Sequence, residues 1–356
     1  MNALWSLLAF LLALGVLVSF HELGHYSAAK FCGVKVLKFS VGFGGSIWKY
    51  QKDTNSTEWA ISSIPLGGYV KMDDDSFKSK KLWQRSLIVA AGPIANFLLA
   101  ILFLTVLFSS GVPQLPAKMV EPTKDTLAYE MGIYSGDHIT GWKSEGEESF
   151  RPIASWNQLR WRLMDALTAK KSFSLEVLDA QKKPQLIVFN KEKFPSLSPN
   201  TDPISQLGLK PDTSEPIEWF ELRLNPIQAI YTASERVWDI SLVSVRMLAG
   251  IFTGESSIKQ LGGPLSIADM AGKSAQVGWQ SYLGFLALIS ISLGILNLIP
   301  LPMLDGGQLL YDVWELLTGS RVPQSWQNVL QRFGVASLML LTVLALFNDI
   351  SRLFLR

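Results

Sequence analysis

Cysteine, histidine and net charge are all scarce in this chain, and each shortage excludes a class of protein or of site. The single cysteine, Cys32, cannot form an intramolecular disulfide or build a cysteine-based zinc site. The 32 Lys and Arg residues nearly balance the 30 Asp and Glu residues and are scattered, so we expect no nucleic-acid partner. Only three histidines are present, His21, His25 and His138, so a metal site must use His138 or add a carboxylate.

Apolar residues are abundant instead: they make up 48% of the 356 residues. We predict a polytopic α-helical membrane protein with four transmembrane helices and an attached polar domain. For the first apolar run a cleaved signal peptide is the alternative, but no basic residue precedes Trp5, which favours a retained helix. The four candidate runs lie at 3–20, 87–108, 282–299 and 333–347.

The first apolar run ends in the sequence H-E-L-G-H at residues 21–25. Because residues four apart lie on the same face of a helix, His21 and His25 can bind one metal ion. H-E-x-x-H on a helix is typical of zinc hydrolases, in which the glutamate, here Glu22, is the general base. A chance match is the alternative. Ionisable residues at the end of an apolar helix are costly to bury without a function, and this favours a metal site.

The third run ends at a predicted break in the helix, and an acid follows that break. Two prolines flank Leu301 and cannot sustain a regular helix. Irregular backbone at membrane depth is tolerated only where protein or a water-filled cavity receives it, so we expect Asp305 to face inward. It would complete a site of two histidines and one carboxylate, with the fourth zinc position left for water. Alternatively, Asp305 only caps the helix that begins near Gly306. His138 lies in a soluble-looking segment, and we do not expect it to be a ligand.

Residues 32–82 alternate β-branched and aromatic residues around glycines, which predicts hairpin strands. Glycines such as Gly42 and Gly44, on either side of Phe43, mark places where another backbone can approach closely. The segment is either a small sheet that caps the membrane end or an edge strand that pairs with an extended substrate, and we favour the second. In the following run we expect Asn96 to act in helix packing, with an active-site role as the alternative.

Residues 112–215 carry many charges and no membrane-length apolar run, which indicates an extramembrane domain. The stretch from Leu127 to Ile139 resembles the PDZ pattern of a short helix, a Gly-apolar pair, and Gly-Asp-x-Ile at the start of a strand. We expect a helix from Trp156 to Leu167 and strands at 173–178 and 185–189. Residues 216–280 mix apolar and charged residues at helical spacing, which predicts amphipathic helices along the membrane surface.

Charge in the short loops predicts the orientation in the membrane. Ten Lys and Arg residues lie between Lys30 and Arg85 and none precedes the first run, so that loop is expected in the cytoplasm. The N-terminus, the PDZ-like domain and the C-terminus then lie outside. The expected segments are 1–31 (first span with the histidine motif), 32–82 (cytoplasmic-side β region), 83–111 (second span), 112–215 (PDZ-like domain), 216–280 (surface helices), 281–304 (third span), 305–326 (cytoplasmic-side loop and helix) and 327–356 (fourth span and C-terminus).

Taken together, these motifs resemble the site-2 protease family of intramembrane zinc metalloproteases, and within it the bacterial branch of the regulator of sigma-E protease. The resemblance implies a bacterial inner-membrane enzyme with zinc held by His21, His25 and Asp305, Glu22 as base, and Asn297 contacting the substrate backbone. It also implies single-pass membrane substrates, such as anti-sigma factors and remnant signal peptides, cleaved in contact with membrane lipids. The segments that carry it are the H-E-x-x-H motif, 42–44, 67–70, 91–96 and 297–306.

The chain departs from the family pattern in one substantial way. Well-known members of the branch carry two tandem PDZ domains, and this chain has room for only one.

Two other classes of function are alternatives to a protease. An ion transporter using the His and Asp residues would usually show internal repeats, and none is visible across four spans. A non-catalytic PDZ scaffold would leave the intact set of His, Glu and Asp residues unexplained.

Overall fold

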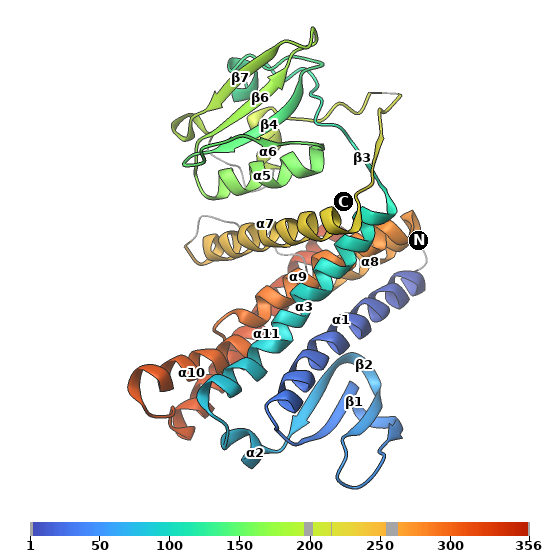
Figure 1. Ribbon diagram of the computed structural model, residues 1–356, viewed down its shortest axis with the longest axis vertical. Helices are drawn as coiled ribbons and strands as arrows, with labels where there is room; N and C mark the ends of the chain where they lie inside the picture. Colours follow the sequence, from blue (N-terminus) through green and yellow to red (C-terminus); the bar gives the residue numbers. More distant parts are fainter. Residues whose placement is uncertain (1–2, 196–201, 215, 254–262, 355–356) are drawn as a thin grey trace. The chain divides into compact units, whose positions relative to one another are not determined.

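The computed structural model of this protein describes residues 3–195, 202–214, 216–253 and 263–354 (Figure 1). The chain forms two compact units, which are described separately below. The first comprises Met1–Leu104 and Leu261–Arg356, and the second comprises Thr105–Gln260.

Three long apolar helices are long enough to cross a membrane. They are α1 (Ala3–Phe31), α3 (Leu82–Ser110) and α9 (Trp279–Leu298), with mean hydropathies of 2.1, 2.4 and 1.8 in their most apolar windows. They confirm a membrane protein and give three candidate spans among the described residues. A fourth long helix, α11 (Gln324–Phe354), has a shorter apolar stretch at Thr342–Ser351, so the fourth span stays a prediction.

Small residues let the three spans pack closely in the first unit. Ala9 and Ala13 of α1 form a buried cluster with residues of α9 and of α8 (Pro264–Val277). Gly24 of α1 lies so close to α3 that a Cβ atom there would be 2.2 Å from the carbonyl oxygen of Ala91. The hydroxyl of Ser290 on α9 donates to the carbonyl of Asn96 on α3 at 2.7 Å. The spans therefore form a tight bundle in which α3 contacts both α1 and α9.

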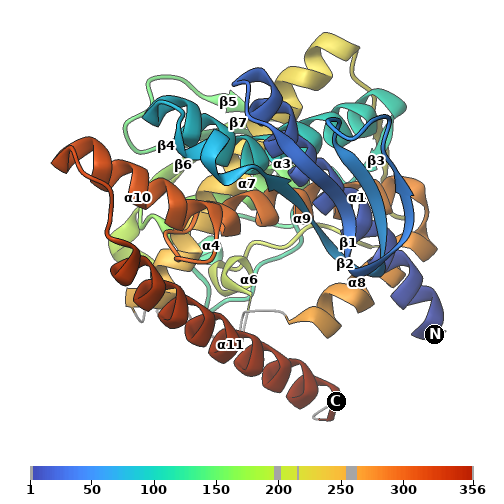
Figure 2. The same ribbon diagram turned by 90° about the horizontal axis from the view of Figure 1, so that it is seen from below.

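Two bent strands form a small sheet beside α1 (Figure 2). They are β1 (Val36–Tyr50) and β2 (Glu58–Met72), followed by a short helix, α2 (Asp74–Lys78). Both strands fold back on themselves, so that Phe39 of β1 pairs with Trp59 on one side and Val70 on the other. The stretch 68–72 is therefore an edge of the sheet. Buried Cys32, Val34 and Val36 pack with Ala29 and Ile88 and fix the sheet to α1 and α3.

The second unit is built around a four-stranded antiparallel sheet in the order β5-β4-β6-β7. Its core contains a stack of three rings, with Trp142 and Phe189 on either side of Phe173 at centroid distances of 4.6 and 4.7 Å. The elements are α4 (Leu127–Glu130), β4 (His138–Ser144), β5 (Arg151–Pro152), α5 (Trp156–Thr168), β6 (Phe173–Leu178), β7 (Pro184–Phe189), a 3-10 turn (Lys191–Lys193) and α6 (Pro203–Leu207). Its assignment as a PDZ-like domain stays a prediction.

Helix α7 (Pro226–Thr253) belongs to the second unit and is bound to α5 by ion pairs. Arg162 on α5 contacts Glu235 at 2.8 Å and Asp239 at 3.2 Å. Burial lowers the pKa of Arg236 to about 10. Charged residues of α7 thus contact α5, and the expected position of this segment along a membrane surface stays a prediction. A short sheet between β3 (Val112–Gln114) and β8 (Phe220–Leu222) joins the two ends of this unit.

Candidate metal centre

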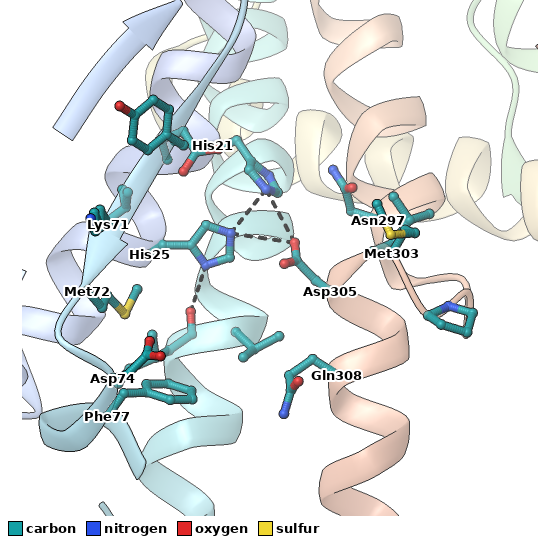
Figure 3. A pocket seen from close by; sticks show the side chains of 17 residues that line it. His21, His25, Lys71, Met72, Asp74, Phe77, Asn297, Met303, Asp305 and Gln308 are labelled. Carbon is teal, nitrogen blue, oxygen red and sulfur yellow. Dashed lines mark hydrogen bonds and ion pairs between the residues drawn. The ribbon is translucent and has the colours of Figure 1, made fainter. Parts of the chain in front are cut away.

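Two imidazoles and one carboxylate converge between α1 and the start of α10 (Asp305–Thr318) (Figure 3). The Nε2 atoms of His21 and His25 are 3.1 Å apart. The Oδ2 atom of Asp305 lies 3.2 Å from the first and 3.5 Å from the second. These residues form the metal-compatible group found among the described residues. The packing of the helices brings Asp305 next to His25, although the two residues are 280 positions apart in the sequence.

The three donor atoms fit a tetrahedral zinc ion. Zinc–ligand bonds of about 2.0–2.1 Å place the ligands of a tetrahedron about 3.3 Å apart, which matches the observed triangle. Without a cation the arrangement is unfavourable, because the acceptor atoms of two neutral imidazoles face each other and a carboxylate oxygen. Oδ2 of Asp305 is buried and has no hydrogen-bond donor. A divalent cation at the centre of the triangle would satisfy all three atoms.

Helix α3 fixes the orientation of both imidazoles. Nδ1 of His25 lies 2.8 Å from the carbonyl oxygen of Ile88, an acceptor, so the hydrogen is on Nδ1 and Nε2 is free to bind a metal. Nδ1 of His21 lies 3.0 Å from the side-chain amide of fully buried Asn96, whose Oδ1 has no partner. The metal-binding tautomer of His21 needs an acceptor there, and a half-turn of the amide places Oδ1 at Nδ1. Asn96 is thus the partner that orients His21.

Gly92 lets α3 approach the imidazoles. A Cβ atom at this position would lie 2.3 Å from Nε2 of His25 and 2.8 Å from Cε1 of His21. Gly92 and Asn96 are four residues apart, so they share one face of α3. This face was interpreted from sequence mainly as a packing surface, and the structure shows that it also lies against both histidines.

The break after α9 carries Asp305 to the histidines. Ile299 ends the helix with extended backbone, and Leu301 and Leu304 form tight turns before α10 begins. Gly306 and Gly307 pack directly on this turn, because a Cβ atom at either would lie within 2.3 Å of a backbone carbonyl oxygen. Asp305 is the first residue of α10, so the same residue starts the helix and faces the imidazoles.

A pocket of about 650 Å³ lies in front of the three donor atoms. Glu22 lines it beside the histidines, and Asn297 lines it from the end of α9. Residues 69–72, at the edge of the β1–β2 sheet, form another wall. The backbone N–H of Val70 faces the Glu22 carboxylate. The pocket thus combines a metal-compatible triangle, an adjacent carboxylate, a side-chain amide and a strand edge.

Three residues expected to bind substrate lie next to the pocket rather than in its described lining. Phe43 covers Gly67 and is stacked on Tyr69, which lines the pocket, at a centroid distance of 6.3 Å. Gly42 and Gly44 adopt φ values of +91° and +85°, which favour glycine, and shape the bend that places Phe43 there. His138 begins β4 in the second unit and belongs to no described metal group.

Two histidines four residues apart on a membrane helix, a carboxylate beside them and an unused glutamate define the class of a zinc hydrolase with its site between apolar helices. The model of peptidase family M50 matches residues 9–341, which is most of the chain. The chain therefore belongs to peptidase family M50, a family of membrane metallopeptidases.

Curated relatives align with this chain over nearly their full lengths. The chain is similar to Protease RseP of Yersinia pestis, with 33% identity over 99% of this chain and 100% of the relative. It is similar to the regulator of sigma E protease of Haemophilus influenzae, with 32% identity over 99% and 100%. A relative in Ralstonia nicotianae, 33% identical over 98% and 99%, carries "zinc metalloprotease" in its name. These alignments run over 446 to 458 positions, so the relatives include residues that this chain of 356 lacks.

Proposed function

We propose that this protein is a zinc metalloprotease that hydrolyses peptide bonds in the membrane-spanning segments of other proteins. His21, His25 and Asp305 hold the zinc ion, and Glu22 is the general base. The observation that carries this proposal is the triangle of three donor atoms at 3.1, 3.2 and 3.5 Å, set between apolar helices and opening into the pocket that Glu22 lines. Bound zinc supplies a Lewis acid that lowers the pKa of water and polarises a peptide carbonyl.

Glu22 performs the proton transfers. It follows His21 directly in the helix and lines the same pocket, so its carboxylate can take a proton from the attacking water and return it to the leaving amine. The N–H of Val70 faces that carboxylate and can orient it. General-base catalysis by one positioned side chain typically contributes about 10²–10⁴-fold in rate.

The substrate must be held in an extended conformation, because a helix hides its carbonyl groups in its own hydrogen bonds. The edge of the sheet at 69–72 forms one wall of the pocket and can add the substrate as another strand. The amide of Asn297 faces the pocket from the opposite side and can bind the substrate backbone. Glycine and proline in a substrate helix lower the cost of unwinding and favour cleavage there.

The cellular role follows from the relatives and from the charge pattern. Because relatives carry the name "regulator of sigma-E protease", we propose the bacterial inner membrane as the location and anti-sigma factors and remnant signal peptides as substrates. The basic loop between Lys30 and Arg85 supports a cytoplasmic-side active site, with the domain at 112–215 on the periplasmic side. Its four-stranded sheet and the helix α5 support the PDZ-like assignment.

The test compares zinc content with cleavage of a single-pass membrane substrate in purified protein. We expect Glu22→Gln to keep its zinc and to lose at least about 10²-fold in cleavage rate. Asp305→Asn should lose zinc and activity together. Glu130→Gln, at an exposed glutamate in the other unit, is the control for the same chemical change. Full activity in Glu22→Gln would refute the assignment of the base, and full zinc content in Asp305→Asn would refute the ligand set.

A further inference from the structure

Asp305 depends on α10 for its position, because it is the first residue of that helix. The preceding segment from Ile299 to Leu304 is not helical and turns tightly, so it cannot place a carboxylate by itself. Whatever holds α10 against the bundle therefore sets the distance from the carboxylate to the two imidazoles.

Two polar contacts hold α10 against α3. The hydroxyl of Ser86 donates to Oδ2 of Asp312 at 2.8 Å, and Asp312 is buried. Nη2 of Arg85 lies 2.7 Å from Oε1 of Glu315, and the Arg85 side chain is only 6% exposed. Arg321 extends the second contact. Its Nε lies 3.5 Å from Oε2 of Glu315, and its Nη2 donates to the backbone carbonyl of Lys78 in α2.

The acids of these contacts share one face of α10 with Asp305. Asp305, Asp312 and Glu315 are separated by seven and three residues, which is helical spacing, so all three point toward the same side. A small rotation or shift of α10 that broke the contacts of Asp312 and Glu315 would therefore also move Asp305 away from the histidines.

The partners of these acids lie on the helix that orients the histidines. In the first turns of α3, Arg85 and Ser86 contact α10. Further along the helix, Ile88 accepts a hydrogen bond from His25, and Gly92 lies against both imidazoles. Asn96 contacts His21. Helix α3 contributes no ligand, yet it contacts the elements that carry all three. It is the common support of the metal site.

We propose that Arg85, Ser86, Asp312 and Glu315 are positioning residues for the metal carboxylate, acting by fixing the first turn of α10 at coordinating distance from the two imidazoles. This inference rests on the proposed zinc site. It assigns a function to polar residues outside the described lining of the pocket. In the Arg85–Glu315 pair the arginine is buried and the glutamate partly buried, and such a pair is weak evidence of added stability.

The test measures metal affinity directly on the purified full-length protein after removal of metal. Co²⁺ is titrated in competition with a chelator, and its visible absorption reports the coordination geometry. We expect Ser86→Ala, Asp312→Asn and Glu315→Gln to weaken Co²⁺ binding by about 10–100-fold, the range measured for supporting residues around metal ligands. Arg85→Lys, which keeps the charge, should bind more tightly than Arg85→Met. Asp269→Asn removes an exposed ion pair with Lys273 on α8 and should bind as the wild type does.

Thermal unfolding of the metal-free variants separates positioning from folding. Ser86→Ala deletes a single hydroxyl and leaves the ion pair, so it is the variant least affected in folding. Unchanged Co²⁺ affinity in Ser86→Ala, Asp312→Asn and Glu315→Gln would overturn the proposal, even if their melting temperatures fell. If instead the wild type bound no Co²⁺, or His21→Ala bound it equally well, the zinc site itself would be wrong.

Discussion

Adding one methyl group at Gly92 should disable the metal site while leaving the fold in place. The Cβ atom of alanine would lie 2.3 Å from Nε2 of His25, about 1 Å short of ordinary contact at 3.4 Å. The imidazole cannot simply rotate away, because its Nδ1 is held by the carbonyl of Ile88. His21 is within 2.8 Å of the same methyl group and is held by Asn96. Both ligands must therefore move.

The magnitude follows from the size of that displacement. A misplacement of about 1 Å in an active site can cost about 10²-fold in rate, and disturbed support of a metal ligand costs about 10–100-fold in affinity. The affinity loss corresponds to about 1.4–2.7 kcal/mol. Alanine also favours a helix over glycine by up to about 1 kcal/mol, so the melting temperature need not fall with the activity.

Gly15→Ala is the matched control for this experiment. Gly15 lies in α1, also inside a helix, and a Cβ atom there has nothing within 4 Å. Zinc content, Co²⁺ affinity and cleavage of a single-pass substrate should be normal in Gly15→Ala and strongly reduced in Gly92→Ala. Wild-type affinity and cleavage in Gly92→Ala would refute the packing of α3 against the imidazoles.

Three further outcomes are expected. Asn96→Leu should lower metal affinity by about 10–100-fold in the same Co²⁺ titration, because His21 loses the acceptor that fixes its tautomer. Burial, helped by nearby Lys118, lowers the pKa of His138 below its usual 6.5, so the stability it contributes above that pH is lost as the pH falls through the folded-state pKa. The melting temperature should therefore drop less between about pH 7.5 and about pH 5.5 in His138→Gln than in the wild type. Asp349→Ala should reduce unfolding free energy by about 1–3 kcal/mol in denaturant, since buried Asp349 of α11 accepts from the backbone of Gly263 and Leu265 at the start of α8.

Apolar length and helical spacing were enough to predict the elements that carry the site. The three candidate spans follow from uninterrupted apolar runs, which have few other stable arrangements. The expected helix at Trp156–Leu167 corresponds to α5 at Trp156–Thr168, and the strand at 173–178 corresponds to β6. The fourth run stays a prediction, because the apolar stretch of its helix, Thr342–Ser351, is shorter than a membrane span.

The residues that we propose for the chemistry were visible in the sequence because their types and spacing are constrained by local helical geometry and by the preferences of zinc. His21, Glu22 and His25 are fixed relative to one another by one turn of helix, and Asp305 follows two prolines that only a break in the helix explains. The roles of their partners were harder to predict, because these residues act through contacts between helices. The sequence favoured helix packing for Asn96, with an active-site role as the alternative, and no local signal marked Ile88. Which face of α3 meets the imidazoles is decided by contacts between residues 63 and 75 positions apart. How α10 is held at the distance that lets Asp305 reach them is decided by contacts such as that between Ser86 and Asp312, which are 226 positions apart.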